Sequence, residues 1–228
     1  MAKKKSDYLK TYKPDIPSDL IASSAKNLDL IEKKQKQKQI VEAASKLFFR
    51  KGFHGTNIRE IAEESGMSMG QLYHYISSKD DILFLVYKHL QELWYQYLVD
   101  CGFEEAEDAL ARLHRAIRST IEFPARNKKL FQFVFSEAKY LGKEHLRVIL
   151  DMDNRNVSGF FQKLLEDVNK EYSMECDTEL AAKFITFITV FIGLRGWNLK
   201  KWTTEEVVDF MVIFILQGLG LPGNVEDP

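Results

Sequence analysis

The sequence predicts an all-α protein. Apolar residues recur at helical spacing along most of the chain, and no stretch alternates between apolar and polar residues with the period of two that is typical of a strand. Prolines are scarce as well, since Pro124 is the only one between Pro17 and Pro222. An apolar fraction of 45% suits a globular protein, and 228 residues are enough for one large domain or two small ones.

Residues 1–34 are expected to form a basic N-terminal extension, irregular for most of its length and helical from about residue 28. This segment is rich in lysine, contains Pro14 and Pro17, and shows little periodicity. The first clear helix is predicted at about 36–51, and Gly52 ends it. Its apolar positions form one buried stripe of Ile40, Val41, Ala44, Leu47 and Phe48.

A second and a third helix are predicted to follow, separated by a tight turn at 64–68. Thr56 is the expected N-cap of the second helix, whose core face contains Ile58, Ile61 and Ala62. In the turn, Gly66 can adopt the positive φ that ends a helix, and Ser68 can cap the next one. Gln71 comes three residues after Ser68, which is a capping-box pattern. The third helix is expected to bury Leu72, Tyr75 and Ile76.

The rest of the chain is predicted to be helical. Ser77 or Ser78 is expected to cap a fourth helix at 79–100, whose first turn carries Asp80 and Asp81. Further helices are predicted at about 104–122, 127–141, 143–171, 177–199 and 204–218, with breaks between them that include one at Phe123-Pro124. Helices of these lengths predict an orthogonal or bundled all-α domain.

Charge is distributed unevenly along the chain. Residues 1–80 carry fifteen Lys/Arg against ten Asp/Glu, and residues 81–228 carry seventeen against twenty-three, so the two parts have net charges of +5 and −6. A basic end joined to an acidic body indicates that one part meets a polyanion, although lysines that only solvate a tail would give the same balance.

Cysteine usage and hydropathy favour a cytoplasmic protein. Cys101 and Cys176 lie far apart and lack metal-binding spacing, so free thiols in a reducing cytoplasm are expected. No signal peptide is visible at the N-terminus. The longest apolar run, 184–194, is shorter than the ~20 residues that a membrane span needs, so no membrane partner is expected.

A DNA-reading helix-turn-helix consists of a helix, a tight glycine-containing turn and a short second helix, and the predicted second and third helices have this arrangement. The third helix also presents residues that suit DNA better than water: Met69, Gly70, Gln71, Tyr73 and His74. Several short segments match a known pattern: 43–48 (AASKLF), 51–53 (KGF), Thr56, 61–62, 65–68 (SGMS), 70–75 (GQLYHY) and 78–80 (SKD). Together they resemble the DNA-binding domain of the tetracycline-repressor-type (TetR) family of bacterial transcriptional regulators. The resemblance runs in order and spacing from residue 43 to residue 80.

The resemblance implies a helix-turn-helix DNA-binding domain at 35–81 and a helical effector-binding and dimerisation domain at 82–228. It also implies contacts with double-stranded operator DNA by Thr56, Arg59, Ser68, Gly70, Gln71, Tyr73, His74 and Lys79. Two interpretations of Gln71 remain open, since it can bond adenine N6 and N7 together or turn back onto Ser68 as part of the capping box. Lysines 33, 34, 36 and 38 can follow neighbouring phosphates or solvate a tail.

The last two helices are apolar on nearly every side, at 184–192 and at 207–216. A helix of this kind must be buried on every side. One explanation is that the second side meets another copy of the chain, and the resemblance implies a homodimer built through these two helices. The alternative is that both helices are central in the core of a monomer.

Phenylalanines are dense after residue 120, which predicts either an ordinary core or an apolar ligand pocket. The expected lining of such a pocket is Phe123, Phe131, Phe135, Arg155, Phe160, Phe187, Phe191 and Arg195. The arginines could hold the polar end of an effector, although Arg195 could instead pair with an acid across a dimer. Some members of the family that this chain resembles respond to fatty acyl thioesters, so a hydrophobic effector of that kind is one candidate.

No catalytic constellation is visible. The five histidines lack metal-binding spacing, and the chain has no G-x-S-x-G, no P-loop and no G-x-G-x-x-G after a strand. The sequence therefore predicts no enzyme, no cofactor and no metal site. It predicts a ligand-responsive transcriptional repressor that a hydrophobic effector releases from a palindromic operator. The alternative is a constitutive dimeric DNA-binding protein without an effector, but the C-terminal part is far larger than dimerisation requires.

Overall fold

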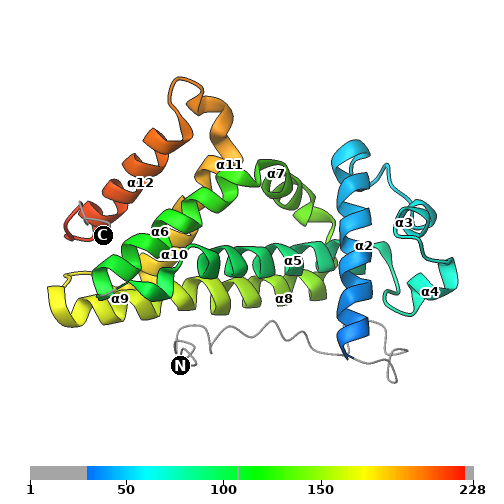
Figure 1. Cartoon of the computed structure of the whole chain (residues 1–228), viewed down its shortest axis with the longest axis horizontal. Helices are drawn as coiled ribbons and strands as arrows, with labels where there is room; N and C mark the ends of the chain where they lie inside the picture. The colour runs from blue at the N-terminus through cyan, green and yellow to red at the C-terminus, as the bar shows by residue number, and fades with distance from the viewer. Residues whose placement is uncertain (1–29, 107, 224–228) are drawn as a thin grey trace. The chain divides into compact units, whose positions relative to one another are not determined.

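The structure, a computed structural model, describes residues 30–106 and 108–223, and these residues are helical with no strand among them (Figure 1). This confirms the all-α prediction. The first elements are α2 (Leu30–Lys51), α3 (Ile58–Glu64), α4 (Met69–Tyr73) and α5 (Lys79–Asp100). The later ones are η2 (Phe103–Glu105), α6 (Ala109–Arg126), α7 (Lys128–Glu137), η3 (Ala138–Tyr140), α8 (Lys143–Asp153), η4 (Asn154–Ser158), α9 (Gly159–Tyr172), α10 (Thr178–Thr189), α11 (Phe191–Arg195), η5 (Gly196–Leu199) and α12 (Thr204–Gly218).

The described residues divide into two compact units. The N-terminal unit contains residues 30–92 together with 132–150, and the C-terminal unit contains residues 93–131 together with 151–223. The N-terminal unit is therefore larger than the predicted domain at 35–81, because it includes a later segment of the chain. Most of the predicted N-terminal extension, residues 1–29, lies outside the described residues, and 30–34 belong to α2.

The ends of α2 and α3 follow from a few local residues. Gly52 follows α2 with a φ of 77°, which glycine adopts without a steric penalty, as predicted. The prediction that Thr56 caps α3 is wrong, because the cap is the next residue, Asn57. The Asn57 side chain accepts the Glu60 N–H at 3.0 Å, and the Glu60 carboxylate accepts the Asn57 N–H at 2.9 Å. Each of these bonds satisfies an N–H that the first turn of a helix leaves without a partner.

The start of α5 is held by Asp81. Its carboxylate accepts the N–H groups of Ser77 and Ser78, at 2.6 and 3.0 Å, while its own N–H donates to the Ser78 hydroxyl at 3.2 Å. This confirms Ser78 as the cap. The fourth helix was predicted at 79–100, and the structure agrees.

In the C-terminal unit, α6 is the central helix, and α9, α10, α11 and α12 all pack on it. The predicted break at Phe123-Pro124 is wrong, since α6 continues through Pro124 to Arg126. Pro124 lacks the N–H that another residue would donate to the carbonyl four positions earlier, yet the helix continues for two residues beyond it. Gly193 of α11 lies directly against it, because a Cβ on Gly193 would come within 2.9 Å of the Pro124 Cβ. This glycine is what allows α11 to approach α6 so closely.

The predicted helix at 143–171 is interrupted by a turn of π-helix, η4, between α8 and α9. Such turns are frequent at functional sites and insert one extra residue into a helix. Asn156 and Ser158 of this turn are buried, and the Ser158 hydroxyl lies 3.4 Å from the hydroxyl of Thr186 on α10. The turn thus brings polar side chains into the interior of the C-terminal unit.

Asp153, which ends α8 just before this turn, should make the stability of the protein depend on pH. Burial raises the pKa of its carboxyl from 3.8 to about 6. A raised pKa means that the folded state binds the proton more tightly, so stability is lost as pH rises from about 4 to about 6. We expect Asp153→Asn to stabilise the protein by up to about 3 kcal/mol at pH 7.5 and hardly at all at pH 4.

Urea unfolding at the two pH values measures this difference. Asp151→Asn is the matched control, since Asp151 is exposed on the same helix and pairs with Arg155 at 2.8 Å. A gain for Asp153→Asn that is equal at both pH values would contradict the prediction.

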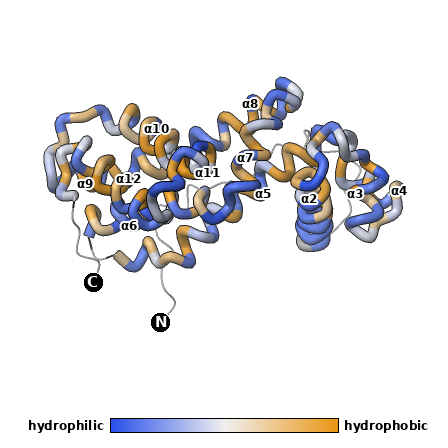
Figure 2. The backbone as a smooth tube through the Cα atoms, turned by 90° about the horizontal axis from the view of Figure 1, so that it is seen from above, coloured by the Kyte–Doolittle hydropathy of each residue, from blue (hydrophilic) through white to orange (hydrophobic). Residues whose placement is uncertain are grey.

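The helices α10, α11 and α12 expose many apolar side chains. Figure 2 shows hydrophobic residues along α10 and α12. The exposed ones are Leu180, Phe184, Phe187, Phe191, Phe210, Ile213 and Phe214. The helical segment Thr178–Leu199 has 22 residues and contains an 18-residue stretch with a mean hydropathy of 1.4, so by length and composition alone it could cross a membrane. The apolar run predicted at 184–194 lies within this segment, between Lys183 and Arg195.

Candidate nucleic-acid interface

The helix-turn-helix consists of α3, a tight turn and α4, and α2 packs behind α3. Gly66 has a φ of 69°, as predicted, and no other heavy atom would meet a Cβ at this position. Glycine is therefore needed for its backbone conformation and not for lack of space. The Met67 N–H donates to the Ala62 carbonyl at 2.9 Å and closes the turn. Two ion pairs tie α3 to α2: Lys46 lies 3.3 Å from Glu64, and Lys51 contacts Glu60.

The short helix α4 begins with the predicted capping box. The Ser68 hydroxyl accepts the Gln71 N–H at 3.2 Å, and the Gln71 side-chain oxygen accepts the Ser68 N–H at 2.9 Å. Leu72, Tyr75 and Ile76 are buried, which fixes the opposite side of the helix against the core. Because its inner side is fixed, α4 presents a constant outer side to solvent.

The structure places six of the eight predicted DNA-contact residues at the surface: Arg59 on α3 and Ser68, Gly70, Gln71, Tyr73 and His74 on or beside α4. The hydroxyl of Tyr73 suits a phosphate contact, and its side chain is 45% exposed. The amide of Gln71 suits a base edge in the major groove. The arrangement thus brings donors for phosphate and for bases onto one short helix.

The other two predicted residues, Thr56 and Lys79, are less exposed than these six. Thr56 is only 2% exposed, and its hydroxyl donates to the Gly52 carbonyl at 2.9 Å, so its side chain holds the turn after α2. Lys79 is half-buried with its ammonium group 4.2 Å from the centre of the Phe53 ring, and burial lowers its pKa. A phosphate contact would require this side chain to turn away from the ring.

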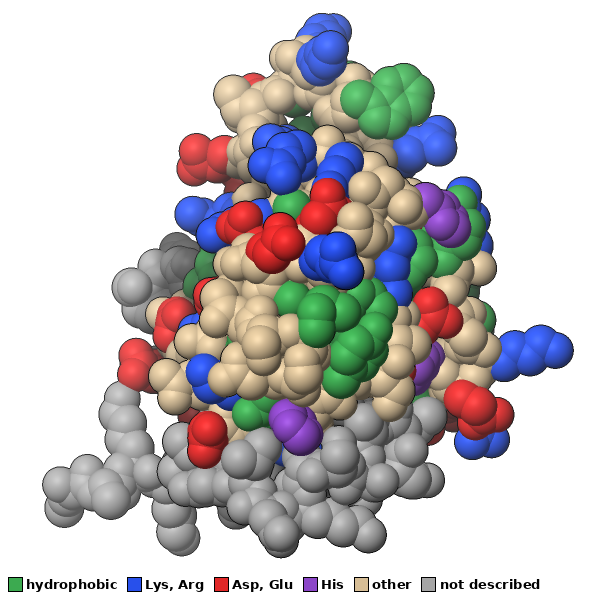
Figure 3. Space-filling model, turned by 90° about the vertical axis from the view of Figure 1, so that its right-hand side faces the viewer, with side chains coloured by type: hydrophobic (Ala, Val, Ile, Leu, Met, Phe, Trp, Pro, Cys, Tyr) green, Lys and Arg blue, Asp and Glu red, His purple; other side chains and the backbone are tan. Residues whose placement is uncertain are grey.

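The part of the chain that contains the helix-turn-helix is only mildly basic. Residues 30–80 carry nine Lys/Arg against six Asp/Glu. In Figure 3, blue and red side chains alternate around an apolar patch on this side of the molecule. We therefore expect local contacts from α4, and not a broad positive field, to set much of the affinity for DNA.

Several residues that support the helix-turn-helix come from the later segment 132–150 and were not predicted from the sequence. Phe133 stacks on Phe48 with ring centres 5.2 Å apart, and Tyr140 stacks on Phe53 at 5.9 Å. His145 of α8 lies 3.3 Å from the Asp81 carboxylate that caps α5. The only sequence signal for these contacts is the aromatic and histidine content of 131–145, because pairing over such a separation leaves no periodic pattern.

The eight residues predicted to line a ligand pocket are not gathered by the structure into one site. Phe123, Phe131 and Phe160 are buried in the C-terminal unit, where their rings pack edge-on against other aromatic rings. The remaining five are exposed at the surface: Phe135, Arg155, Phe187, Phe191 and Arg195. Phe187 in particular is 73% exposed, so its assignment to an interior pocket is corrected.

Comparison with known proteins assigns this arrangement to a family. Residues 40–86, from within α2 to within α5, match the family model described as bacterial regulatory proteins, tetR family. The HTH-type transcriptional regulator HbdR of Aromatoleum sp. (strain CIB) is 41% identical over 168 residues, which cover 74% of this chain and 71% of HbdR. The chain belongs to the tetR family of bacterial regulatory proteins.

More distant relatives of this TetR-family protein match it over nearly their whole length. The HTH-type transcriptional repressor KstR2 of Rhodococcus jostii (strain RHA1) is 24% identical over 202 residues, which cover 86% of this chain and 97% of KstR2. The crystal structure of AibR in complex with isovaleryl coenzyme A and operator DNA has a TM-score of 0.59 at 21% identity, and the match covers 77% of this chain and 95% of AibR. The likeness to AibR shows the fold alone. As a TetR-family protein the chain is a DNA-binding transcriptional regulator, with α3 and α4 as its helix-turn-helix.

Proposed function

We propose that this TetR-family protein is a cytoplasmic repressor that binds a two-fold symmetric operator as a homodimer and leaves it when a hydrophobic effector binds. The observation that carries the proposal is the outer side of α4, where the amide of Gln71 and the hydroxyl of Tyr73 are exposed on a helix whose inner side is locked in the core. One such helix reads few bases, and a symmetric dimer doubles the number that are read.

Support for the dimer comes from the spacing of exposed apolar residues. Leu180, Phe184, Phe187 and Phe191 follow one another at i, i+4, i+7 and i+11, so they form one stripe along α10 and α11. On α12, the exposed rings of Phe210 and Phe214 stack on each other 6.0 Å apart. A soluble protein rarely leaves apolar surface of this kind uncovered, and a second copy would supply a matching surface.

Support for a hydrophobic effector is indirect. The C-terminal unit has a core rich in aromatic rings, and the π-helical turn adds buried polar groups, Asn156 and Ser158, to its interior. An apolar pocket with a few polar groups is the usual form of a small-molecule site. AibR, which shares the fold, was solved with an acyl thioester of coenzyme A and operator DNA. A constitutive DNA-binding protein without an effector remains the alternative function.

Operator binding is tested by titrating labelled promoter fragments from the host genome and random DNA of the same length. One fragment should bind at least about a hundredfold more tightly than random DNA, and its affinity should fall as salt is raised. Footprinting of that fragment should protect two halves related by two-fold symmetry. Equal affinity for every fragment would contradict the proposed repressor.

The effector is tested by adding medium-chain and long-chain acyl-coenzyme A thioesters, free fatty acids and aromatic acids to the complex. At least one hydrophobic compound should release the DNA and raise the melting temperature of the free protein. Release only by a small hydrophilic metabolite would overturn the hydrophobic effector. No release by any compound would favour the constitutive alternative.

A further inference from the structure

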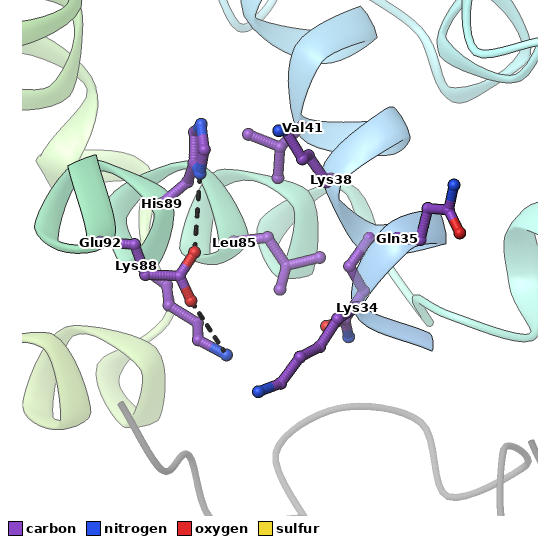
Figure 4. Close-up of a pocket in the computed structure, with 9 residues that line it drawn as sticks. Lys34, Gln35, Lys38, Val41, Leu85, Lys88, His89 and Glu92 are labelled. Carbon is purple, nitrogen blue, oxygen red and sulfur yellow. Dashed lines mark ion pairs between the residues drawn. The ribbon is translucent and has the colours of Figure 1, made fainter. Parts of the chain in front are cut away.

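A cleft in the N-terminal unit lies between α2 and α5, and no residue of α4 lines it. Its volume is about 430 Å³ (Figure 4). Lys34, Lys38 and Val41 line it at i, i+4 and i+7 on α2, and Leu85, Lys88 and Glu92 line it at i, i+3 and i+7 on α5. Each helix thus presents one row of side chains to the cleft. Each row has one apolar residue, Val41 or Leu85, at one end and two charged residues along the rest.

The cleft has an apolar floor and a cationic rim. Val41 and Leu85 are 3% and 2% exposed, so they belong to the core beneath it. In Figure 4 the side chains of Lys34 and Lys88 extend to the same side of the gap between the two helices. The Lys88 side chain is only 16% exposed, so its ammonium group has lost much of its hydration.

The charges that line the cleft do not cancel. Glu92 is the single acidic residue of the lining, and it lies 3.7 Å from the Lys88 ammonium group and 3.6 Å from His89. Burial alone would raise the pKa of the Glu92 carboxyl, but the hydrogen bond with His89 and the nearby charges of Lys88, His89 and Lys34 outweigh burial and lower it. Three ammonium groups against one carboxylate leave a charge of +2 on the lining, even with a neutral histidine, and Glu42, which lies 3.9 Å from Lys38, is outside the lining.

We propose that the α2–α5 cleft binds a phosphorylated small molecule of nucleotide size that carries at least two negative charges. Such an anion would balance the +2 lining and replace the hydration that the lysines lose. The cleft is within the size range of small-molecule sites, and its apolar floor fits a ring or a short apolar group beside the phosphate. A DNA backbone would use the lysines but not the floor, which favours a small ligand.

Occupancy of this cleft would link α2 to α5 within the unit that holds α3 and α4. Since α2 packs on α3 and α3 packs on α4, the anion would restrain the support of the helix-turn-helix. The cleft would thus be a second regulatory site, and it does not depend on the hydrophobic effector proposed above.

The probes for calorimetry and thermal melting of the full-length protein are ADP, pyrophosphate and uncharged adenosine. ADP should bind and raise the melting temperature, and adenosine should do neither. Lys34→Gln/Lys88→Gln should weaken ADP binding by at least about tenfold, since each substitution removes one of the facing charges. The control Lys139→Gln/Lys143→Gln makes the same change of charge elsewhere in the N-terminal unit and should leave ADP affinity unchanged.

A second variant reverses the sign of the effect, so the test does not depend on one substitution. Glu92→Gln removes the only negative charge of the lining and should make ADP bind more tightly. The proposal is overturned if neither ADP nor pyrophosphate binds, or if ADP binds equally to the wild type and to Lys34→Gln/Lys88→Gln. It is also overturned if Lys34→Gln/Lys88→Gln changes only the affinity for DNA, since the lysines would then be phosphate contacts of the operator. Operator binding measured without ADP tests the proposed repressor function separately from the proposed anion site.

Discussion

Phe187→Glu is expected to convert the proposed dimer into monomers and to abolish tight operator binding. Phe187 is 73% exposed in the single chain, so the substitution removes nothing from the core of the protomer. Covering a phenylalanine side chain contributes about 1.5–3 kcal/mol, and a two-fold interface contains the residue twice. A loss of about 3–6 kcal/mol weakens the dimer by about two to four powers of ten, before the cost of burying two charges is added.

Sedimentation measures the change in mass, and circular dichroism should show an unchanged helix content. Phe135→Glu is the matched control, because Phe135 is also exposed, at 49%, but belongs to α7 in the N-terminal unit. The control should remain dimeric. If Phe187→Glu is dimeric with wild-type affinity for the operator, the association surface is not on α10.

Substitution of Gln71 is the second large effect that we expect. The side-chain oxygen of Gln71 already accepts the Ser68 N–H at 2.9 Å, so the amide NH₂ remains as a donor toward DNA. In this state Gln71 can read an acceptor such as guanine O6 or thymine O4, whereas the bidentate contact with adenine would first require the cap to open. The capped geometry therefore favours a base with an acceptor opposite Gln71.

Two variants separate the cap from the base contact. Gln71→Glu keeps an acceptor for the Ser68 N–H, as in the common form of the capping box, but removes the donor. Gln71→Ala removes both. Both should lose about 1–3 kcal/mol of operator affinity per half-site and relax the preference at one base pair, while only Gln71→Ala should also lower the unfolding free energy, by about 1 kcal/mol.

Competition titrations with operators changed at single base pairs measure the preference, and urea unfolding measures the stability. Tyr73→Ala is the comparison, since loss of a phosphate contact should weaken binding to every sequence alike. An unchanged base preference in both Gln71 variants would place the base-reading side chain elsewhere.

The local features of the helix-turn-helix could be predicted from the sequence because each depends on a few adjacent residues. The positive φ of Gly66, the Ser68–Gln71 capping box and the end of α2 at Gly52 were predicted and are present. Thr56 was misplaced by one residue, because the sequence offers two adjacent capping side chains and only the three-dimensional turn shows that the threonine hydroxyl faces Gly52.

Long-range features could not be predicted in this way. A phenylalanine in a helical pattern can line a core, a pocket or an interface, and the pattern is the same in each case. Phe160 and Phe187 were therefore both predicted to line the ligand pocket, although Phe160 is 5% exposed and Phe187 is 73% exposed. The π-helical turn at Asn154–Ser158 has no sequence signature either, since it depends on how α8 and α9 pack.

Because the N-terminal unit is built from two separate segments of the chain, recombination with related regulators is limited in where it can exchange parts. The unit is completed by 132–150, which supply the partners of Phe48, Phe53 and Asp81. A single crossover after residue 81 would join these three residues to foreign neighbours and leave aromatic faces and a buried carboxylate mismatched. A hybrid with the operator specificity of this chain therefore needs both 30–92 and 132–150 from the same parent. If the start of the chain also comes from that parent, the hybrid requires three crossovers, after residues 92, 131 and 150, instead of one.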